Sequence, residues 1–229
     1  MLFDLRGSGR RTTIKIVYVT LALLMGGGLV LFGIGGDVSG GLVDAITGSS
    51  GSTGTERFED REKQAARQAQ ARPQDPAAWA ALTRARFQLA GAELDSTTGA
   101  FSDEGKAQLA RAADAWQRYL ELDPKKPDDS LASLMVQAYS PAALNKPVEM
   151  VRAQEIVVEA RPTSATFANL AVFAYQAGQT RKGDLARGRA LDEADKDERN
   201  SLKAQLDQAK AQAGAAAAGA GAGPSATGE

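Results

Sequence analysis

Adjacent carboxylates come closest to a catalytic pattern in this sequence. Asp103 is followed by Glu104, and Asp128 is followed by Asp129. Two carboxyl groups carry out acid–base chemistry when a fold holds them across a cleft, and adjacency along the chain does not provide this. At the start of a helix, by contrast, acidic residues are favoured by the helix dipole. We therefore interpret both pairs as residues at helix N-termini.

Other kinds of site chemistry have even less support. The 229-residue chain contains no cysteine and no histidine, which excludes thiol catalysis, disulfides, histidine bases and the usual zinc sites. Asp95, Asp103 and Glu104 do not have the spacing of an EF-hand calcium loop. A formal net charge of −1 does not indicate a nucleic-acid surface. We expect no enzyme, cofactor, metal or small-molecule substrate, and a protein that acts by binding.

Helices must position the binding surface, because residues 55–213 are rich in helix-forming residues and show no alternating strand pattern. Three segments, "AWAALTRARFQ", "SLASLMVQAYS" and "TFANLAVFAYQ", share a large apolar residue, a leucine three positions later and an aromatic five after that. Residues i and i+3 share a helix face. The segments therefore supply six predicted core residues: Trp79, Leu82, Leu131, Leu134, Phe167 and Leu170. Trp116, in the helical stretch that follows the first segment, is the seventh.

A second helical stretch follows each segment, at 102–122, 147–160 and 180–194. Pro124 and Pro162 follow the first two stretches and stop them. The third stretch contains Gly183 and Gly188, which weaken it as a helix. Helices in 55–76 and 195–213 flank the array as caps, with Leu202 and Leu206 directed inward in the second of these.

This pattern resembles the tetratricopeptide repeat (TPR), a helix-turn-helix unit of about 34 residues with the pattern W-x2-L-G-x2-Y, then A-x3-F, then P. "WAALTRARF" followed by "ARAADAWQRYLELDP" fits best, with Ala112 and Trp116 in the second helix. Thr83 replaces the family's glycine, and "GAELDSTTGAFSDEG" is inserted between the first two helices. The resemblance implies an all-α solenoid of stacked helical hairpins.

The resemblance also implies a concave groove lined by the first helix of each pair. Transferred to this sequence, the groove face gives five predicted contact residues: Arg84, Phe87, Tyr139, Asn169 and Tyr175. The rest of this face consists of small or aliphatic residues from all three units: Ala80, Ala81, Ala132, Ser133, Val136, Ala168 and Val172. Such a surface suits an extended or helical polypeptide with apolar side chains. The alternative position for the aromatic rings is the core between repeats.

An apolar run of 19 residues, 16–34, precedes the helical part. A helix of this length approaches the ~30 Å of a bilayer core. A signal peptide has a shorter apolar segment and a small-x-small cleavage site, so the sequence favours a retained transmembrane helix over a removed signal. Four basic residues precede the span, and the next one is Arg57. The positive-inside rule then places the N-terminus in the cytoplasm.

The expected organisation has five segments: a basic cytoplasmic N-terminus at 1–15, a transmembrane helix at 16–36, a Gly/Ser-rich linker at 37–54, a TPR-like α-helical domain with cap helices at 55–213, and a disordered Ala/Gly tail at 214–229. The protein would then be a single-pass cell (inner) membrane protein with an extracytoplasmic repeat domain.

The first 36 residues resemble the anchors of membrane-tethered folding factors near the bacterial secretion channel. This resemblance implies a chaperone-like role with translocating or newly exported chains, with secretion-channel components among the candidate partners. The alternative is a structural scaffold that assembles a cell-envelope or cell-division complex through folded partners.

Overall fold

The computed structural model describes residues 52–95 and 98–221, which belong to a unit spanning Gly51–Glu229. These residues form eight α-helices and no strand, and their one β-type contact is an isolated antiparallel bridge between Leu94 and Phe101. The prediction of an all-α fold is therefore confirmed for this part of the chain. The predicted N-terminus at 1–15, transmembrane helix at 16–36 and nearly all of the linker lie outside the described residues.

None of the helices in 52–95 and 98–221 combines the length and the hydrophobicity of a membrane span. The transmembrane segment therefore stays a prediction from the sequence.

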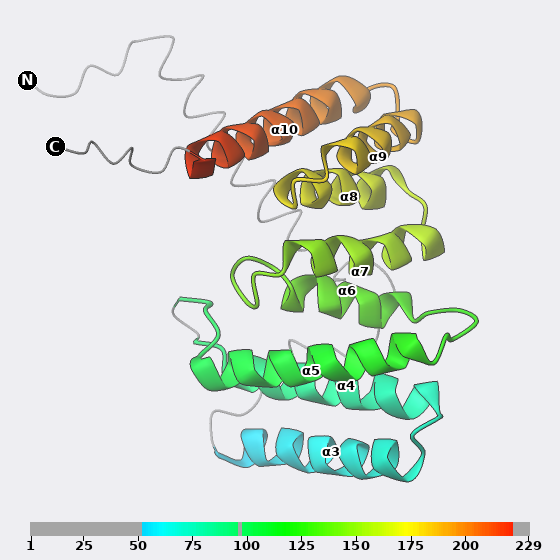
Figure 1. Cartoon of the computed structure of the whole chain (residues 1–229), viewed down its shortest axis with the longest axis vertical. Coiled ribbons are helices and arrows are strands. Elements are labelled where there is room, and N and C mark those ends of the chain that lie inside the picture. The colour runs from blue at the N-terminus through cyan, green and yellow to red at the C-terminus, as the bar shows by residue number, and fades with distance from the viewer. Residues whose placement is uncertain (1–51, 96–97, 222–229) are drawn as a thin grey trace, which may run out of the picture. The chain divides into compact units, whose positions relative to one another are not determined.

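The helices pack as consecutive hairpins. The three pairs are α4 (Pro76–Ala92) with α5 (Asp103–Glu121), α6 (Asp129–Ala138) with α7 (Pro147–Ala160), and α8 (Ser164–Gln176) with α9 (Thr180–Asp192). Helix α3 (Ser52–Ala71) packs on α4, and α10 (Arg199–Gly221) packs on α8 and α9. Figure 1 shows these helices following one another in chain order from α3 to α10. The predicted paired helices and the predicted flanking helices are all present.

Short polar residues and prolines set the helix starts. Asp75 accepts a hydrogen bond from the Ala77 N–H at 2.9 Å, and Pro76 begins α4. Ser102 caps α5, and Asp103 and Glu104 lie in its first turn. In α6, Asp128 is the N-cap and Asp129 lies in the first turn. The interpretation of both acidic pairs as N-terminal helix residues is therefore confirmed. Capping side chains stabilise these helix starts because they accept hydrogen bonds from backbone N–H groups that have no partner within the helix.

The core extends through the stack of hairpins in three clusters. The largest joins α4, α5, α6 and α7, a second joins α7, α8, α9 and α10, and a smaller one joins α3, α4 and α5. Four of the predicted core residues are buried: Leu82, Trp116, Leu131 and Leu170. The other three, Trp79, Leu134 and Phe167, are partly buried and pack against these clusters. The buried face is therefore the one that the i, i+3 pattern predicts.

Helix α10 is longer than the sequence analysis predicts. The predicted tail begins at 214, whereas the helix continues through 214–221 and ends at Gly221. Alanine has the highest helix propensity, so four consecutive alanines after Gly214 sustain the helix although glycine opposes it. Leu206 is buried and Leu202 packs beside it, as predicted. Residues 222–229 lie outside the described part.

Candidate protein-binding surface

Three of the five predicted contact residues are aromatic, and the structure places their rings in the core. Phe87 is 7% exposed, Tyr139 is 2% exposed and Tyr175 is 4% exposed. The aromatic in each segment is eight positions after the first apolar residue, which turns it by about 80° on an α-helix. In the first segment, α4 packs against α3, α5 and α6, so neighbouring helices also cover the side of α4 from which the Phe87 ring extends. The core position that the sequence left open as an alternative is where these rings lie.

The two polar contact residues remain accessible. Arg84 on α4 is about half exposed, and its Nη2 lies 2.9 Å from Oδ2 of Asp128, the N-cap of α6. Asn169 on α8 is partly exposed, and its amide has no hydrogen-bond partner among the residues of 52–95 and 98–221. These two residues belong to different hairpins and do not form one site with the buried rings. Their role in binding stays a prediction.

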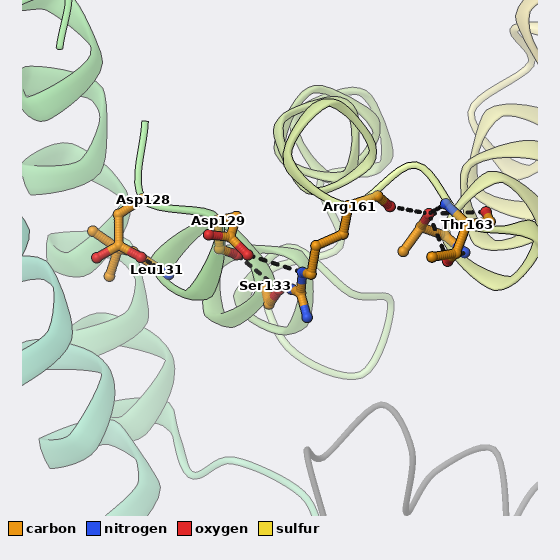
Figure 2. A network of polar contacts seen from close by, with 7 residues as sticks. Asp128, Asp129, Leu131, Ser133, Arg161 and Thr163 are labelled. Carbon is orange, nitrogen blue, oxygen red and sulfur yellow. Dashed lines mark hydrogen bonds and ion pairs between the residues drawn. The ribbon is translucent and has the colours of Figure 1, made fainter. Parts of the chain in front are cut away.

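A polar network fixes adjacent hairpins to one another (Figure 2). Arg161, which follows α7, places Nε 2.8 Å from Oδ2 of Asp129 and donates from Nη2 to Ser133 Oγ at 3.0 Å, so it contacts α6 twice. Its carbonyl oxygen accepts from Thr166 Oγ1 at 2.6 Å in the first turn of α8. Thr163 and Thr166 form a capping box at the same helix start. One arginine therefore links three helices and helps to set the angle between two hairpins.

An open cleft of about 720 Å³ lies between α8 and α10. It is lined by Val172, Tyr175, Gln176, Gly178, Thr180, Ala209, Lys210, Gln212, Ala213, Gly214 and Ala216. Val172 and Tyr175 belong to the groove face that the TPR resemblance predicts for the third unit. The surface of the cleft combines small and apolar side chains with two primary amides. We call this feature the α8/α10 cleft.

One wall of the α8/α10 cleft carries Tyr175 and Lys210, which are joined through Asp184 of α9 in a polar triad. The Tyr175 hydroxyl donates to Asp184 Oδ1 at 2.9 Å, and Lys210 Nζ lies 2.6 Å from the same oxygen. Burial raises the pKa of Tyr175 to about 12, and the bond to Asp184 adds to this. The hydrogen bonds from Lys210 and Tyr175 lower the pKa of Asp184. Near neutral pH, Tyr175 is therefore a neutral phenol that donates its hydrogen bond to the ionised carboxylate of Asp184.

Gly183 allows this wall to form. A Cβ atom added there would lie 2.5 Å from Cδ1 of Tyr175 and closer still to its Cε1. The ring therefore lies directly against the backbone of α9, which only glycine permits. The sequence analysis treats Gly183 as a weakness of the third unit, whereas the structure shows that it has a packing role.

Sequence reasoning missed the α10 side of the cleft. Lys210 and Asp184 are 26 residues apart, and no local pattern predicts their ion pair. A signal for the helix face was present, because Leu202, Leu206, Ala209 and Ala213 follow one another at spacings of four, three and four residues. That spacing continues the inward face of α10 into the cleft.

Comparisons with known proteins identify no relative. No protein-family model matches the chain, and searches of curated proteins and of solved structures find no match either.

Proposed function

We propose that this chain is a membrane-anchored protein-binding module of the TPR type, and that it holds or assists translocating or newly exported polypeptides outside the cytoplasm. The observation that carries this proposal is the α8/α10 cleft, with its volume of about 720 Å³. Ligand-binding sites commonly have volumes of about 300–1,000 Å³.

The lining of the cleft favours a polypeptide segment. Val172, Ala209 and Ala213 offer carbon surface for an apolar side chain, while the glycines and alanines leave room for it. Gln176 and Gln212 can both donate to and accept from the peptide groups of a bound segment. An apolar floor with a few polar groups at the rim fits side-chain pockets that recognise extended or helical segments.

The TPR part of the proposal is supported by the order of the elements. Each hairpin pairs a first helix with a second, and the next hairpin packs on it. Helix α10 contacts both α8 and α9, where the first helix of a further repeat would pack. In such an array the α8/α10 cleft lies between two successive first helices, which form the binding face of helical repeats.

The membrane part of the proposal comes from the sequence. The apolar run at 16–34 and the basic residues before it support an anchor with a cytoplasmic N-terminus. Protease added to intact, wall-stripped cells should then degrade the helical domain. Protection of that domain would contradict the proposed orientation.

Crosslinking from the cleft tests the binding role and separates the two functional hypotheses. A photoreactive residue is placed at Gln212, which lines the cleft, and in a control at Gln208, an exposed glutamine one turn earlier on α10. We expect the full-length, membrane-bound chain to crosslink to many unrelated exported polypeptides from 212 but not from 208. A single stoichiometric partner would support the scaffold hypothesis instead. Equal crosslinking from both positions would contradict binding in the cleft.

A further inference from the structure

A second open hollow, of about 560 Å³, adjoins the α8/α10 cleft. It lies at the turn after α8 and the start of α9, and it is lined by Gly178, Gln179, Thr180, Arg181, Lys182 and Leu185. Gly178 and Thr180 line both features, so the hollow and the cleft meet at this turn. Gly178 has a φ of +71°, and nothing lies within 4 Å of the position that its Cβ would take. The junction is therefore open, and we call the second feature the α9 hollow.

The α9 hollow offers carbon surface to a partner. Leu185 is 66% exposed, more than any other large apolar side chain in the described part of the chain. A single exposed leucine is common on protein surfaces. Leu185, however, lines a hollow that opens into the α8/α10 cleft, so a segment bound in the cleft can continue over it.

The α9 hollow also carries a positive charge that has no counterpart. The first turn of α9 contains Arg181 and Lys182 and no acidic residue. Lys182 Nζ lies 2.6 Å from Oε1 of Glu155, which satisfies its charge. Arg181 makes no ion pair or side-chain hydrogen bond with any residue that the structure describes. The helix dipole disfavours a cation in a first turn, so a carboxylate beside Arg181 would relieve two unfavourable effects at once.

We propose that the α8/α10 cleft and the α9 hollow together bind polypeptide segments in which an acidic residue accompanies the apolar ones. The apolar side chains enter the cleft and contact Leu185, and the carboxylate pairs with Arg181. A guanidinium group can hold a carboxylate by two parallel hydrogen bonds, which gives this pairing direction as well as charge. The chain has a formal net charge of −1, so its overall charge does not attract acidic segments and the selection has to be local.

This inference rests on the function proposed for the α8/α10 cleft and adds a preference among polypeptides. Its probes are two labelled 15-residue peptides with leucine at alternate positions. The first has three glutamates among the intervening residues, and the second has glutamine, of the same shape but without charge, at those three places. Fluorescence anisotropy with the full-length chain at low ionic strength measures both affinities. We expect the glutamate peptide to bind at least fivefold more tightly than the glutamine peptide, with the difference shrinking as salt is added.

The two peptides separate failure of the preference from failure of the cleft. Binding of both peptides with equal affinity would overturn the preference for acidic segments and leave the function proposed for the cleft standing. Binding of neither peptide would overturn both.

Variants place the charge selection at Arg181. Arg181→Gln should weaken binding of the glutamate peptide at least threefold and leave the glutamine peptide unchanged. Arg67→Gln is the matched control, because Arg67 is an exposed residue of α3 that does not line either feature. Leu185→Ser, at a position too exposed to affect folding, should weaken binding of both peptides. An equal loss in Arg67→Gln would indicate unspecific charge attraction, and unchanged binding by Arg181→Gln and Leu185→Ser would refute the proposal.

Discussion

Two glycines of α9 should respond in opposite directions to the same substitution. At Gly183, a new methyl group would meet the Tyr175 ring, with Cδ1 at 2.5 Å, whereas nothing lies within 4 Å of the corresponding position at Gly188. Optimal carbon–carbon contacts are about 3.5–4.0 Å, so Gly183→Ala requires the ring to move by roughly 1 Å or more. That movement strains the 2.9 Å hydrogen bond from Tyr175 to Asp184.

The magnitudes follow from three effects. Overpacking of a filled core costs about 1–3 kcal/mol. A weakened hydrogen bond costs about 0.5–1.5 kcal/mol. Alanine in place of glycine stabilises a helix by about 1 kcal/mol. We therefore expect Gly183→Ala to destabilise the domain by about 1–3 kcal/mol and Gly188→Ala to stabilise it by up to about 1 kcal/mol.

Urea unfolding followed by tryptophan fluorescence measures both free energies, with the unsubstituted chain as reference. The two variants differ by about 1–4 kcal/mol, so their thermal midpoints should differ by about 2–16 °C, because a domain of this size shifts by about 2–4 °C per kcal/mol. Equal stability of the two variants would show that the ring is not packed against Gly183, and the described wall of the α8/α10 cleft would then be wrong.

Three further results are expected from unfolding experiments. Tyr139→Ala should lower the free energy of unfolding by about 3–5 kcal/mol, because the Tyr139 ring is fully buried. Tyr139→Phe keeps the ring and should change that free energy by no more than about 0.5 kcal/mol. Equal effects of the two substitutions would place the ring outside the core. Asp128→Ala should lower the free energy of unfolding by about 1 kcal/mol, because it removes the acceptor for the Leu131 N–H. Asp128→Asn should lower it less, because the asparagine side chain still accepts that hydrogen bond. A larger loss in the asparagine variant would contradict the capping role. The pKa of Tyr175 is about 12 in the folded chain and about 10 in the unfolded chain. The contribution of the neutral Tyr175 side chain to the free energy of unfolding is therefore complete below pH 10 and falls as the pH rises toward 12. Tyr175→Phe should flatten that decline in urea midpoints measured from pH 9 to 12, and an unchanged slope would contradict the assignment.

The fold was predictable because its signals are local. Prolines, N-cap residues and runs of helix-forming residues lie within the segments that they define, so the helix boundaries could be predicted to within a few residues. The end of α10 was missed because a run of alanine and glycine fits both a helix and a disordered tail. In the structure, this run of alanine and glycine is helical as far as Gly221.

The binding surface was less predictable because it depends on neighbours distant in sequence. Whether the Tyr139 ring faces a partner or the core depends on how α6 packs against α4, α5 and α7, which no property of the segment itself reveals. The α8/α10 cleft requires α10 to fold back onto α8, and its wall requires Lys210 to reach Asp184. The role of Gly183 likewise follows only from the position of a tyrosine on another helix.

Filling the α8/α10 cleft tests the central claim most directly. Ala213→Trp places an indole ring in the cleft, and Ala211→Trp places the same ring at an exposed position of α10 that does not line it. Affinity is measured by fluorescence anisotropy for the full-length chain and a labelled 15-residue peptide with leucine at alternate positions and lysine at its ends. The account predicts at least tenfold weaker binding by Ala213→Trp, which is about 1.4 kcal/mol, and unchanged binding by Ala211→Trp. Normal affinity in a folded Ala213→Trp chain would contradict the claim that this cleft binds polypeptides.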